Sequence, residues 1–308
     1  MPERRGAILV TGAAGFIGRV VVSKLVARGR MVIGTDVVAP AEMNASTFAV
    51  ADARDVLRHA ALLASAPVDG IVHTGGISGP MLAGDNPAEL FDINVRSTVQ
   101  LLELARTFGL RRFVGCSSVS AYGDLGAAEA VSEAMPLRAS TVYGSSKAMA
   151  DLAIQTYASR FGLSATALRI GWVYGPGRRT DAILQPMIRS GFGGQPFRLA
   201  RGADQPLQFV HVDDVADALL AALDAAGPLR PAYNINGAEV MSVTGIADLV
   251  RAAVPEARIE IGGGMLDDTD QQGTMLLDAA AADLGWTPHH RLEAGIAAYV
   301  EWLRTHPY

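Results

Sequence analysis

The segment Thr11–Gly18 constrains the fold of this 308-residue chain more than any other, because it places three glycines between two regular patterns. The apolar run before them predicts a buried strand at Ala7–Thr11, and the amphipathic run after them predicts a helix at Gly18–Arg28. Glycine allows a tight turn and lets backbone N–H groups approach a pyrophosphate at the start of a helix. The G-x-x-G-x-x-G spacing differs from the G-x-G-x-x-G dinucleotide fingerprint. The prediction of a dinucleotide site therefore depends on the position of the glycines between a strand and a helix. The turn is expected to bind a dinucleotide through Gly12, Gly15, Phe16, Ile17 and Gly18.

Short apolar runs alternate with amphipathic runs as far as residue 170. This alternation predicts a parallel sheet that is covered by helices on both faces through right-handed crossovers. The expected fold class is therefore α/β, a Rossmann-type doubly wound sheet. Further strands are expected at Met31–Asp36, Phe48–Ala51, Gly70–Thr74, Arg112–Ser117 and Ser164–Ile170, and helices at Val56–Ala64, Pro87–Phe108 and Tyr143–Phe161.

Two acidic residues follow predicted strands and bear on the choice of cofactor. Asp36 closes the second strand, where a carboxylate can accept hydrogen bonds from both adenosine ribose hydroxyls and would repel a 2′-phosphate. This position favours NAD over NADP. Asp52 follows the third strand, where it would either contact the adenine amino group, next to Ala53, or cap the following helix. His73 is expected to pack in the core or beside the cofactor rather than to catalyse.

The periodic pattern loosens after Gly175-Pro176-Gly177, and this change suggests two lobes. Residues 1–170 are expected to form the NAD-binding domain, rejoined by about 207–236. Residues 171–206 and 237–308 are expected to form a smaller C-terminal substrate-binding lobe. Later helices are expected at Val212–Ala225, Val243–Val254 and Leu292–Leu303, with a strand at Ala232–Asn236.

Composition excludes several classes of function. The 26 basic and 31 acidic residues give a formal net charge of −5, which argues against a nucleic-acid-binding surface. No apolar run is long enough for a transmembrane helix, and the first residues lack the pattern of a signal peptide. We therefore expect a cytoplasmic protein with neither nucleic acid nor membrane as a partner. The single cysteine, Cys116, excludes an internal disulfide, and the histidine spacing gives little support for a metal site.

Tyr143 and Lys147 are four residues apart, so both side chains lie on one face of the predicted helix. An ammonium beside a phenol stabilises the phenolate, which can accept a hydroxyl proton while hydride leaves the same carbon for a nicotinamide. Ser118 follows the fifth strand and could hydrogen-bond the reacting oxygen. A surface Tyr–Lys pair and ordinary serines at the end of a strand are the alternatives.

The scarcity of lysine makes Lys147 informative. The chain contains 24 arginines and two lysines, Lys24 and Lys147. The arginines fit a composition bias, but that bias does not explain why Lys147 is kept. Lys24 lies on the first predicted helix and is expected to be an ordinary surface residue.

The ordered set of motifs resembles the extended short-chain dehydrogenase/reductase family, also called the NAD-dependent epimerase/dehydratases. The resemblance runs from Thr11 to about Ala222 and continues weakly at Leu284-Gly285-Trp286. The segments that carry it are Thr11–Gly18, Asp36, Asp52, Asn94-Val95, Ser117-Ser118, Ala121-Tyr122-Gly123, Tyr143–Lys147, Leu168-Arg169, Val173–Gly177 and Phe209–Ala216.

The resemblance implies roles for particular residues. Ser118, Tyr143 and Lys147 would form the catalytic triad. Tyr143 and Lys147 would also contact NAD, Lys147 by holding the nicotinamide ribose. The remaining implied contacts to NAD, or supports of its site, are Thr74, Gly75, Gly76, Asn94, Cys116 and Ile170. Family members frequently dimerise through a four-helix bundle of the long helix and the Tyr–Lys helix, so a homodimer is also implied.

Two departures from the family bear on the substrate. Nucleotide-sugar members place an Asn after the Leu-Arg strand and an Arg before the Phe209 aromatic, and both groups contact the diphosphate. Here these positions hold Trp172 and Leu207. We therefore expect a small hydroxylated substrate, a sugar, sugar acid or polyol, whose secondary hydroxyl is oxidised. The alternative is a nucleotide-sugar 4-epimerase or dehydratase with transient reduction of NAD; a silent NAD sensor would not need the Tyr–Lys pair.

Three further residues are candidates for binding the substrate. Arg178 and Arg179 follow the Gly-Pro-Gly turn and could clamp a carboxylate, although a solvated basic pair is an equally good interpretation. Ser78, in the loop after the fourth strand, could offer a hydroxyl.

Overall fold

The computed structural model describes residues 6–40, 42, 45–79, 86–126, 130–180, 183–267 and 269–306. Its centre is a seven-stranded parallel sheet with strand order β11-β7-β5-β4-β1-β2-β3. Strands β1, β7 and β11 are buried along their whole length, which explains their apolar sequence. The expected doubly wound α/β fold is confirmed. The strands are β1 (Ala7–Thr11), β2 (Val32–Asp36), β3 (Thr47–Val50), β4 (Val68–His73), β5 (Arg112–Ser118), β7 (Ala165–Ile170) and β11 (Ala232–Ile235).

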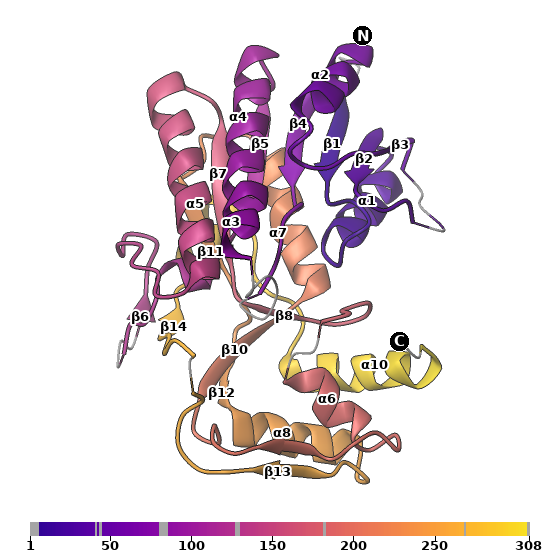
Figure 1. Ribbon diagram of the computed structural model, residues 1–308, viewed down its shortest axis with the longest axis vertical. Coiled ribbons are helices and arrows are strands. Elements are labelled where there is room, and N and C mark those ends of the chain that lie inside the picture. The colour runs from indigo at the N-terminus through magenta and orange to yellow at the C-terminus, as the bar shows by residue number, and fades with distance from the viewer. Residues whose placement is uncertain are drawn as a thin grey trace.

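Helices cover both faces of this sheet (Figure 1). One face carries α2 (Val56–Ser65), α4 (Ser97–Thr107) and α5 (Val142–Phe161), which pack on a cluster around Ile71 and Phe113. The other face carries α1 (Gly18–Ala27), α7 (Val212–Asp224) and α9 (Asp278–Leu284). Among the described residues, no helix is long and apolar enough to cross a membrane.

A smaller lobe lies beyond one end of the sheet, at the bottom of Figure 1. Its core joins three helices to a three-stranded sheet of order β12-β10-β8. These elements are β8 (Trp172–Tyr174), α6 (Leu184–Arg189), β10 (Pro206–His211), β12 (Val240–Ser242), α8 (Val243–Ala253) and α10 (Leu292–Thr305). Two short parallel pairs complete the described strands: β9 (Phe197–Leu199) with β13 (Ile259–Ile261), and β6 (Ala130–Val131) with β14 (Thr274–Met275).

The predicted helix Pro87–Phe108 is the main difference from the expected elements. The structure divides it into α3 (Pro87–Phe91), a π-helical turn (Asp92–Arg96) and α4. The wider turn places Asn94 at a buried position next to the candidate site, and π-helical turns are frequent at functional sites. Residue spacing alone does not distinguish this turn from a continuous helix.

The elements of the two lobes alternate along the sequence, so each lobe is built from several separate segments. Strand β11 and helix α7 lie with the large sheet, whereas β10 pairs with β8 and β12. Helix α9 packs against α7 and β11, although it lies within residues 237–308. The proposed domain boundaries therefore stay a prediction.

Candidate functional site

The glycine turn lies against the end of strand β4. Gly12 has a positive φ of 66°, and a Cβ atom there would lie 2.6 Å from the backbone of Gly75. Thr74 Oγ1 donates a hydrogen bond to the carbonyl of Thr11 at 2.7 Å and so ties the two strand ends together. Only small groups fit this junction, which leaves backbone N–H groups accessible at the start of α1. The cradle fits the pyrophosphate of a dinucleotide.

Asp36 lies at the end of β2, beside the same turn. Its Oδ2 accepts a hydrogen bond from the backbone N–H of Ala14 at 3.0 Å, and its Oδ1 accepts one from Val38 at 3.4 Å. These bonds fix the carboxylate next to the glycine turn, where an adenosine ribose would lie. The geometry fits the cofactor role that the sequence suggested for Asp36.

Asp52 has a different set of contacts from either sequence expectation. Its carboxylate pairs with Arg54, with Nη2 and Oδ2 2.6 Å apart, and Arg54 also pairs with Asp92 at 2.8 Å. Hydrogen bonding to Arg54 lowers the pKa of Asp52 below its ordinary value. The expectation that Asp52 caps the helix is wrong, because Asp55 caps α2 by accepting a bond from Arg58. Contact with adenine stays a prediction for Asp52 and Ala53.

Asn94 holds the loop after β4 against helix α5. Its Oδ1 accepts from the backbone N–H of Ile77 at 2.8 Å, and its Nδ2 donates to the carbonyl of Ile77 and to Oγ of Ser146, both at 3.0 Å. Gly76 packs closely on the same amide. Ser78, which follows Ile77 in the loop, is exposed. Sequence reasoning missed Ser146, although its position directly before Lys147 was a usable signal.

Tyr143 and Lys147 lie together on the buried face of α5. Lys147 Nζ is 6.0 Å from the centre of the Tyr143 ring and donates a hydrogen bond to the carbonyl of Cys116 at 3.1 Å. The lysine is only 8% exposed, and the tyrosine is buried. The pair is therefore not a surface pair, and the alternative interpretation of this spacing is wrong.

The start of α5 lies close to the turn that follows β5. Thr141 caps the helix by accepting a bond from Gly144, and any side chain on Gly144 would overlap the carbonyl of Ser120. Ser118 is buried at the end of β5, and its Oγ accepts from the backbone N–H of Ser120 at 3.2 Å. The close approach brings Ser118 to the same end of the sheet as Tyr143.

Three further groups lie on the strands β4, β5 and β7, at the same end of the sheet as Lys147. Burial raises the pKa of the Cys116 thiol to about 11, so the thiol is neutral, and Ile170 pairs in register with Ser118. His73 lies between the hydroxyls of Thr11 and Thr98, and burial lowers its pKa to about 3. The structure therefore agrees with a packing role for His73.

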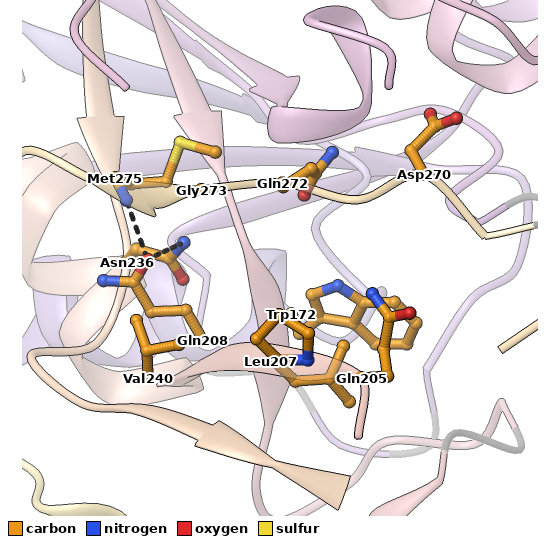
Figure 2. Close-up of a pocket in the computed structure, with 11 residues that line it drawn as sticks. Trp172, Gln205, Leu207, Gln208, Asn236, Val240, Asp270, Gln272, Gly273 and Met275 are labelled. Atoms are coloured by element: carbon orange, nitrogen blue, oxygen red, sulfur yellow. Dashed lines mark hydrogen bonds between the residues drawn. The ribbon is translucent and has the colours of Figure 1, made fainter. Parts of the chain in front are cut away.

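A narrow pocket opens where the two lobes meet, lined by Trp172 and Leu207 (Figure 2). Its free volume is about 20 Å³, room for one water molecule. Gln205 Oε1 and Asn236 Oδ1 are buried there without a hydrogen-bond partner in the described part of the chain. The eleven lining residues include no Lys or Arg, and Asp270 is their one charged member. The pocket therefore offers hydrogen-bond acceptors and an indole face rather than positive charge.

The two arginines after the Gly-Pro-Gly turn separate in the structure. The Arg178 side chain turns inward, donates to the carbonyl of Val173 and lies 6.0 Å from the centre of the Phe16 ring. Arg179 is exposed. The suggested carboxylate clamp by both residues together is therefore not formed in this arrangement.

Two histidines that are far apart in sequence meet beside α7. The rings of His211 and His290 stack with centres 4.1 Å apart, and His290 Nδ1 lies 2.9 Å from Asp214 Oδ1. Ligand atoms of His211, Asp213 and His290 all lie within 4.8 Å of one another, a grouping that sequence spacing did not reveal. Stacked rings do not point their lone pairs at one centre, and Lys24 already pairs with Asp213 at 3.6 Å. The cluster is therefore better described as a packing and ion-pair contact than as a metal site.

The parallel sheet, the glycine turn and the buried Tyr143–Lys147 pair define a Rossmann-type nucleotide-binding protein. The chain belongs to the NAD dependent epimerase/dehydratase family, whose family model matches residues 8–236. The resemblance drawn from the sequence is thereby confirmed. The protein is an enzyme of this family, and its cofactor is NAD.

Several relatives match nearly the whole chain. The UDP-glucose 4-epimerase of Corynebacterium glutamicum is 27% identical over 92% of this chain and 91% of its own length. A putative UDP-glucose 4-epimerase of Methanocaldococcus jannaschii is 30% identical over 96% of this chain and 98% of its own length. The structure of MoeE5 in complex with UDP-glucuronic acid and NAD has a TM-score of 0.87 and 29% identity, covering 97% of this chain and 99% of MoeE5.

Proposed function

We propose that this enzyme oxidises a ring hydroxyl of a nucleotide sugar transiently, as a 4-epimerase or a dehydratase does. The observation that carries the proposal is the match to relatives named as UDP-glucose 4-epimerases, which covers more than nine-tenths of both chains. The sequence alone favoured a small substrate without a nucleotide. Similarity to nucleotide-sugar enzymes over almost the whole length now favours the alternative, so the preferred substrate class is revised.

The proposed chemistry needs one proton acceptor from the protein. Tyr143 accepts the proton of the reacting hydroxyl, and Ser118 hydrogen-bonds the same oxygen and orients it. Lys147 stabilises the phenolate by its positive charge, and the carbonyl of Cys116 holds the ammonium in place. When bound, NAD would supply the hydride acceptor for the same carbon. Tyr143 holds the proton until it is returned to the substrate.

The remaining cofactor contacts are proposed from their place around the glycine turn. Gly12 and Gly75 let the two strand ends pack closely beside the turn that would bind the pyrophosphate. Asp36 would accept the ribose hydroxyls, and Asn94 keeps the adjoining loop in position. The further members of the proposed NAD site are Gly15, Phe16, Ile17, Gly18, Asp52, Ala53, Thr74, Gly76, Cys116, Tyr143, Lys147 and Ile170.

The test is turnover of UDP-glucose, UDP-galactose and dTDP-glucose by the purified enzyme with NAD, followed by NMR of the sugar. We expect an epimer or a 4-keto product with no net accumulation of NADH. Tyr143→Phe should lower turnover by about 100-fold or more, because it removes the proton acceptor. The affinity for NAD should change far less, because the aromatic ring is kept. Absence of any change in all three sugars would overturn the proposal.

The pocket supports a second candidate, a dehydrogenase of small sugar acids or polyols. Trp172, Leu207 and the neutral amides provide no cation to match a diphosphate. Stoichiometric NADH formation from a sugar acid, without turnover of nucleotide sugars, would select this candidate.

We further propose a homodimer that pairs α4 and α5 with the same helices of a second copy. The two helices lie side by side in Figure 1. Val142, Met149 and Leu152 are exposed on α5, and Val99 on α4. An apolar surface of this kind on neighbouring helices favours association with a partner.

A further inference from the structure

A series of buried polar side chains begins at the strand before the glycine turn. His73 Nδ1 lies 2.7 Å from Thr11 Oγ1, and His73 Nε2 lies 3.1 Å from Thr98 Oγ1. Thr98 Oγ1 donates a hydrogen bond to the carbonyl of Asn94 at 2.7 Å. These four residues are each less than 5% exposed, so an unpaired polar group among them would be costly.

The same series of hydrogen bonds continues into α5. Asn94 Nδ2 donates to Ser146 Oγ at 3.0 Å, and Ser146 Oγ donates to the carbonyl of Tyr143 at 2.8 Å. A Cβ atom on Gly76 would lie 2.7 Å from Asn94 Oδ1 and 3.8 Å from Lys147 Nζ. The series therefore ends beside both members of the proposed catalytic pair. The His73 network, as we call it, comprises Thr11, His73, Thr98, Asn94 and Ser146.

The hydroxyls and the imidazole allow only one direction of hydrogen bonding through the His73 network. Thr98 uses its single hydroxyl proton on a carbonyl, which can only accept, so His73 Nε2 must donate to Thr98. Since burial lowers the pKa of His73 to about 3, the ring is neutral and its Nδ1 accepts from Thr11. Each group is paired in this one arrangement, which fixes the segments that the network joins.

We propose that Thr98 and Ser146 are positioning residues, which hold Tyr143 in a fixed place relative to the cofactor turn through the His73 network. The inference rests on the proposed function, because Tyr143 is taken to accept the proton of the reacting hydroxyl. Thr98 restrains the carbonyl of Asn94 in the π-helical turn, and the amide of the same residue binds Ser146. A misplacement of about 1 Å at the reacting atoms can cost about 100-fold in rate, although no contact with the substrate is removed.

The experiment compares Thr98→Val and Thr98→Ser with the wild type, on the nucleotide sugar that the wild type turns over. Thr98→Val keeps the shape of the side chain but removes the hydroxyl, so His73 Nε2 loses its acceptor. We expect kcat to fall by about 10- to 100-fold, while the KM for the sugar and the affinity for NAD change less than about threefold. Thr98→Ser keeps the hydroxyl and should retain kcat within about threefold.

Thr166→Val is the matched control. Thr166 is also completely buried, but its hydroxyl has no hydrogen-bond partner among the residues that the structure describes. The same substitution therefore removes no bond there, and kcat should not change. Equal losses of kcat in Thr166→Val and Thr98→Val would overturn the inference, and so would a rise in KM alone or a failure of Thr98→Ser to restore kcat.

Ser146→Ala tests the other end of the His73 network and should cause a similar loss of kcat. If Thr98 and Ser146 act through one network, the double variant should lose no more than about threefold beyond the larger single loss. Losses that multiply would show that the two residues act separately and would contradict the proposal. Circular dichroism checks the folding of every variant.

Histidine ¹⁵N NMR tests the His73 network without any substrate. The wild type should carry the proton of His73 on Nε2, with the signal assigned by its absence in His73→Asn; a proton on Nδ1 would overturn the inference. If the wild type oxidises a sugar acid but none of the three nucleotide sugars, the nucleotide-sugar function fails. The variants of Thr98 and Ser146 then test the positioning role through the rate of NADH formation.

Discussion

At the scale of single residues, Lys147 is held by the backbone of the sheet rather than by a carboxylate. Its Nζ donates to the carbonyl of Cys116 and lies 6.0 Å from the centre of the Tyr143 ring. Only 8% of the residue is exposed. A compact ammonium fits this space, whereas the planar head of arginine is larger and needs a different set of acceptors. The scarcity of lysine in the chain is consistent with such a requirement.

Lys147→Arg should therefore lower kcat/KM by about 100-fold through misplacement of the charge. Lys24→Arg is the matched control. Lys24 pairs with Asp217 at 2.9 Å on the outside of α7, and arginine can keep that ion pair. Steady-state kinetics with NAD and the sugar that is turned over provide the measurement. Equal effects of the two substitutions would contradict a special role for lysine at 147.

At the scale of elements, one buried ion pair connects β7 with α5. Arg169 Nε lies 2.9 Å from Asp151 Oδ2, with 3% and 0% of the two side chains exposed. The same guanidinium donates to the hydroxyl of Tyr122 and to the carbonyl of Glu133. Because Tyr122 in turn donates to Asn234 on β11, the network joins five separate segments of the chain.

Asp151→Asn should lower the free energy of unfolding by roughly 3 kcal/mol, because Arg169 would remain buried without its counter-ion. Glu103→Gln removes the exposed pair with Arg106 and should cost less than about 1 kcal/mol. Urea denaturation at neutral pH measures both values. A loss for Asp151→Asn no larger than that for Glu103→Gln would show that the network does not depend on the charge pair.

Elements whose pattern is local were predicted well from the sequence. The buried strands are continuous apolar runs, and the predicted helix Tyr143–Phe161 differs from α5 by one residue at its start. The π-helical turn around Asn94 was missed, because it is only five residues long and is continuous with helical turns on both sides. Short elements such as β10 in the smaller lobe and α9 beside the large sheet depend on partners far away in sequence.

The residues of the candidate site were likewise predicted only where they lie on one regular element. Tyr143 and Lys147 were found because four residues on a helix define one face. The inward turn of Arg178, the Arg54 clamp on Asp52 and the His211–His290 stack are contacts between segments with no shared periodicity. Residue types suggested both arginines as candidates, but only the fold shows that Arg178 turns inward while Arg179 is exposed.

At the scale of the whole molecule, buried histidines should make stability depend on pH. Burial lowers the pKa of His73 to about 3, and burial together with the nearby His290 lowers that of His211 to about 4. Both folded values lie below the ordinary value of 6.5, so the unfolded chain binds more protons below that pH. The stabilising contribution is complete above about pH 6.5 and is lost as the pH falls towards the folded values, by roughly 1.4 kcal/mol per pH unit for each histidine.

His211→Asn tests this dependence with little structural change. The imidazole caps α7 by accepting a bond from the backbone N–H of Asp213 at 3.2 Å, and asparagine is a good replacement at a helix N-cap. Between pH 7 and pH 5, the unfolding free energy of the variant should decrease less than that of the wild type. The slope of unfolding free energy against pH should be smaller by the equivalent of about one bound proton. Urea titrations at intermediate pH values measure the slope. An unchanged slope would mean that His211 does not contribute.

The exposed side of α5 predicts the state of association. Met149 and Leu152 are 50% and 52% exposed, whereas Tyr143 and Lys147 lie on the buried side of the same helix. If a second copy covers α5, Leu152→Glu places a charge in an apolar interface and should convert the dimer into monomers. Leu57→Glu on α2 is the matched control, because Leu57 is 79% exposed and outside the proposed interface. Sedimentation velocity should show dimers for the wild type and Leu57→Glu and monomers for Leu152→Glu; a monomeric wild type or a dimeric Leu152→Glu would reject the interface. Because the catalytic pair faces inward, the monomeric variant should still bind NAD.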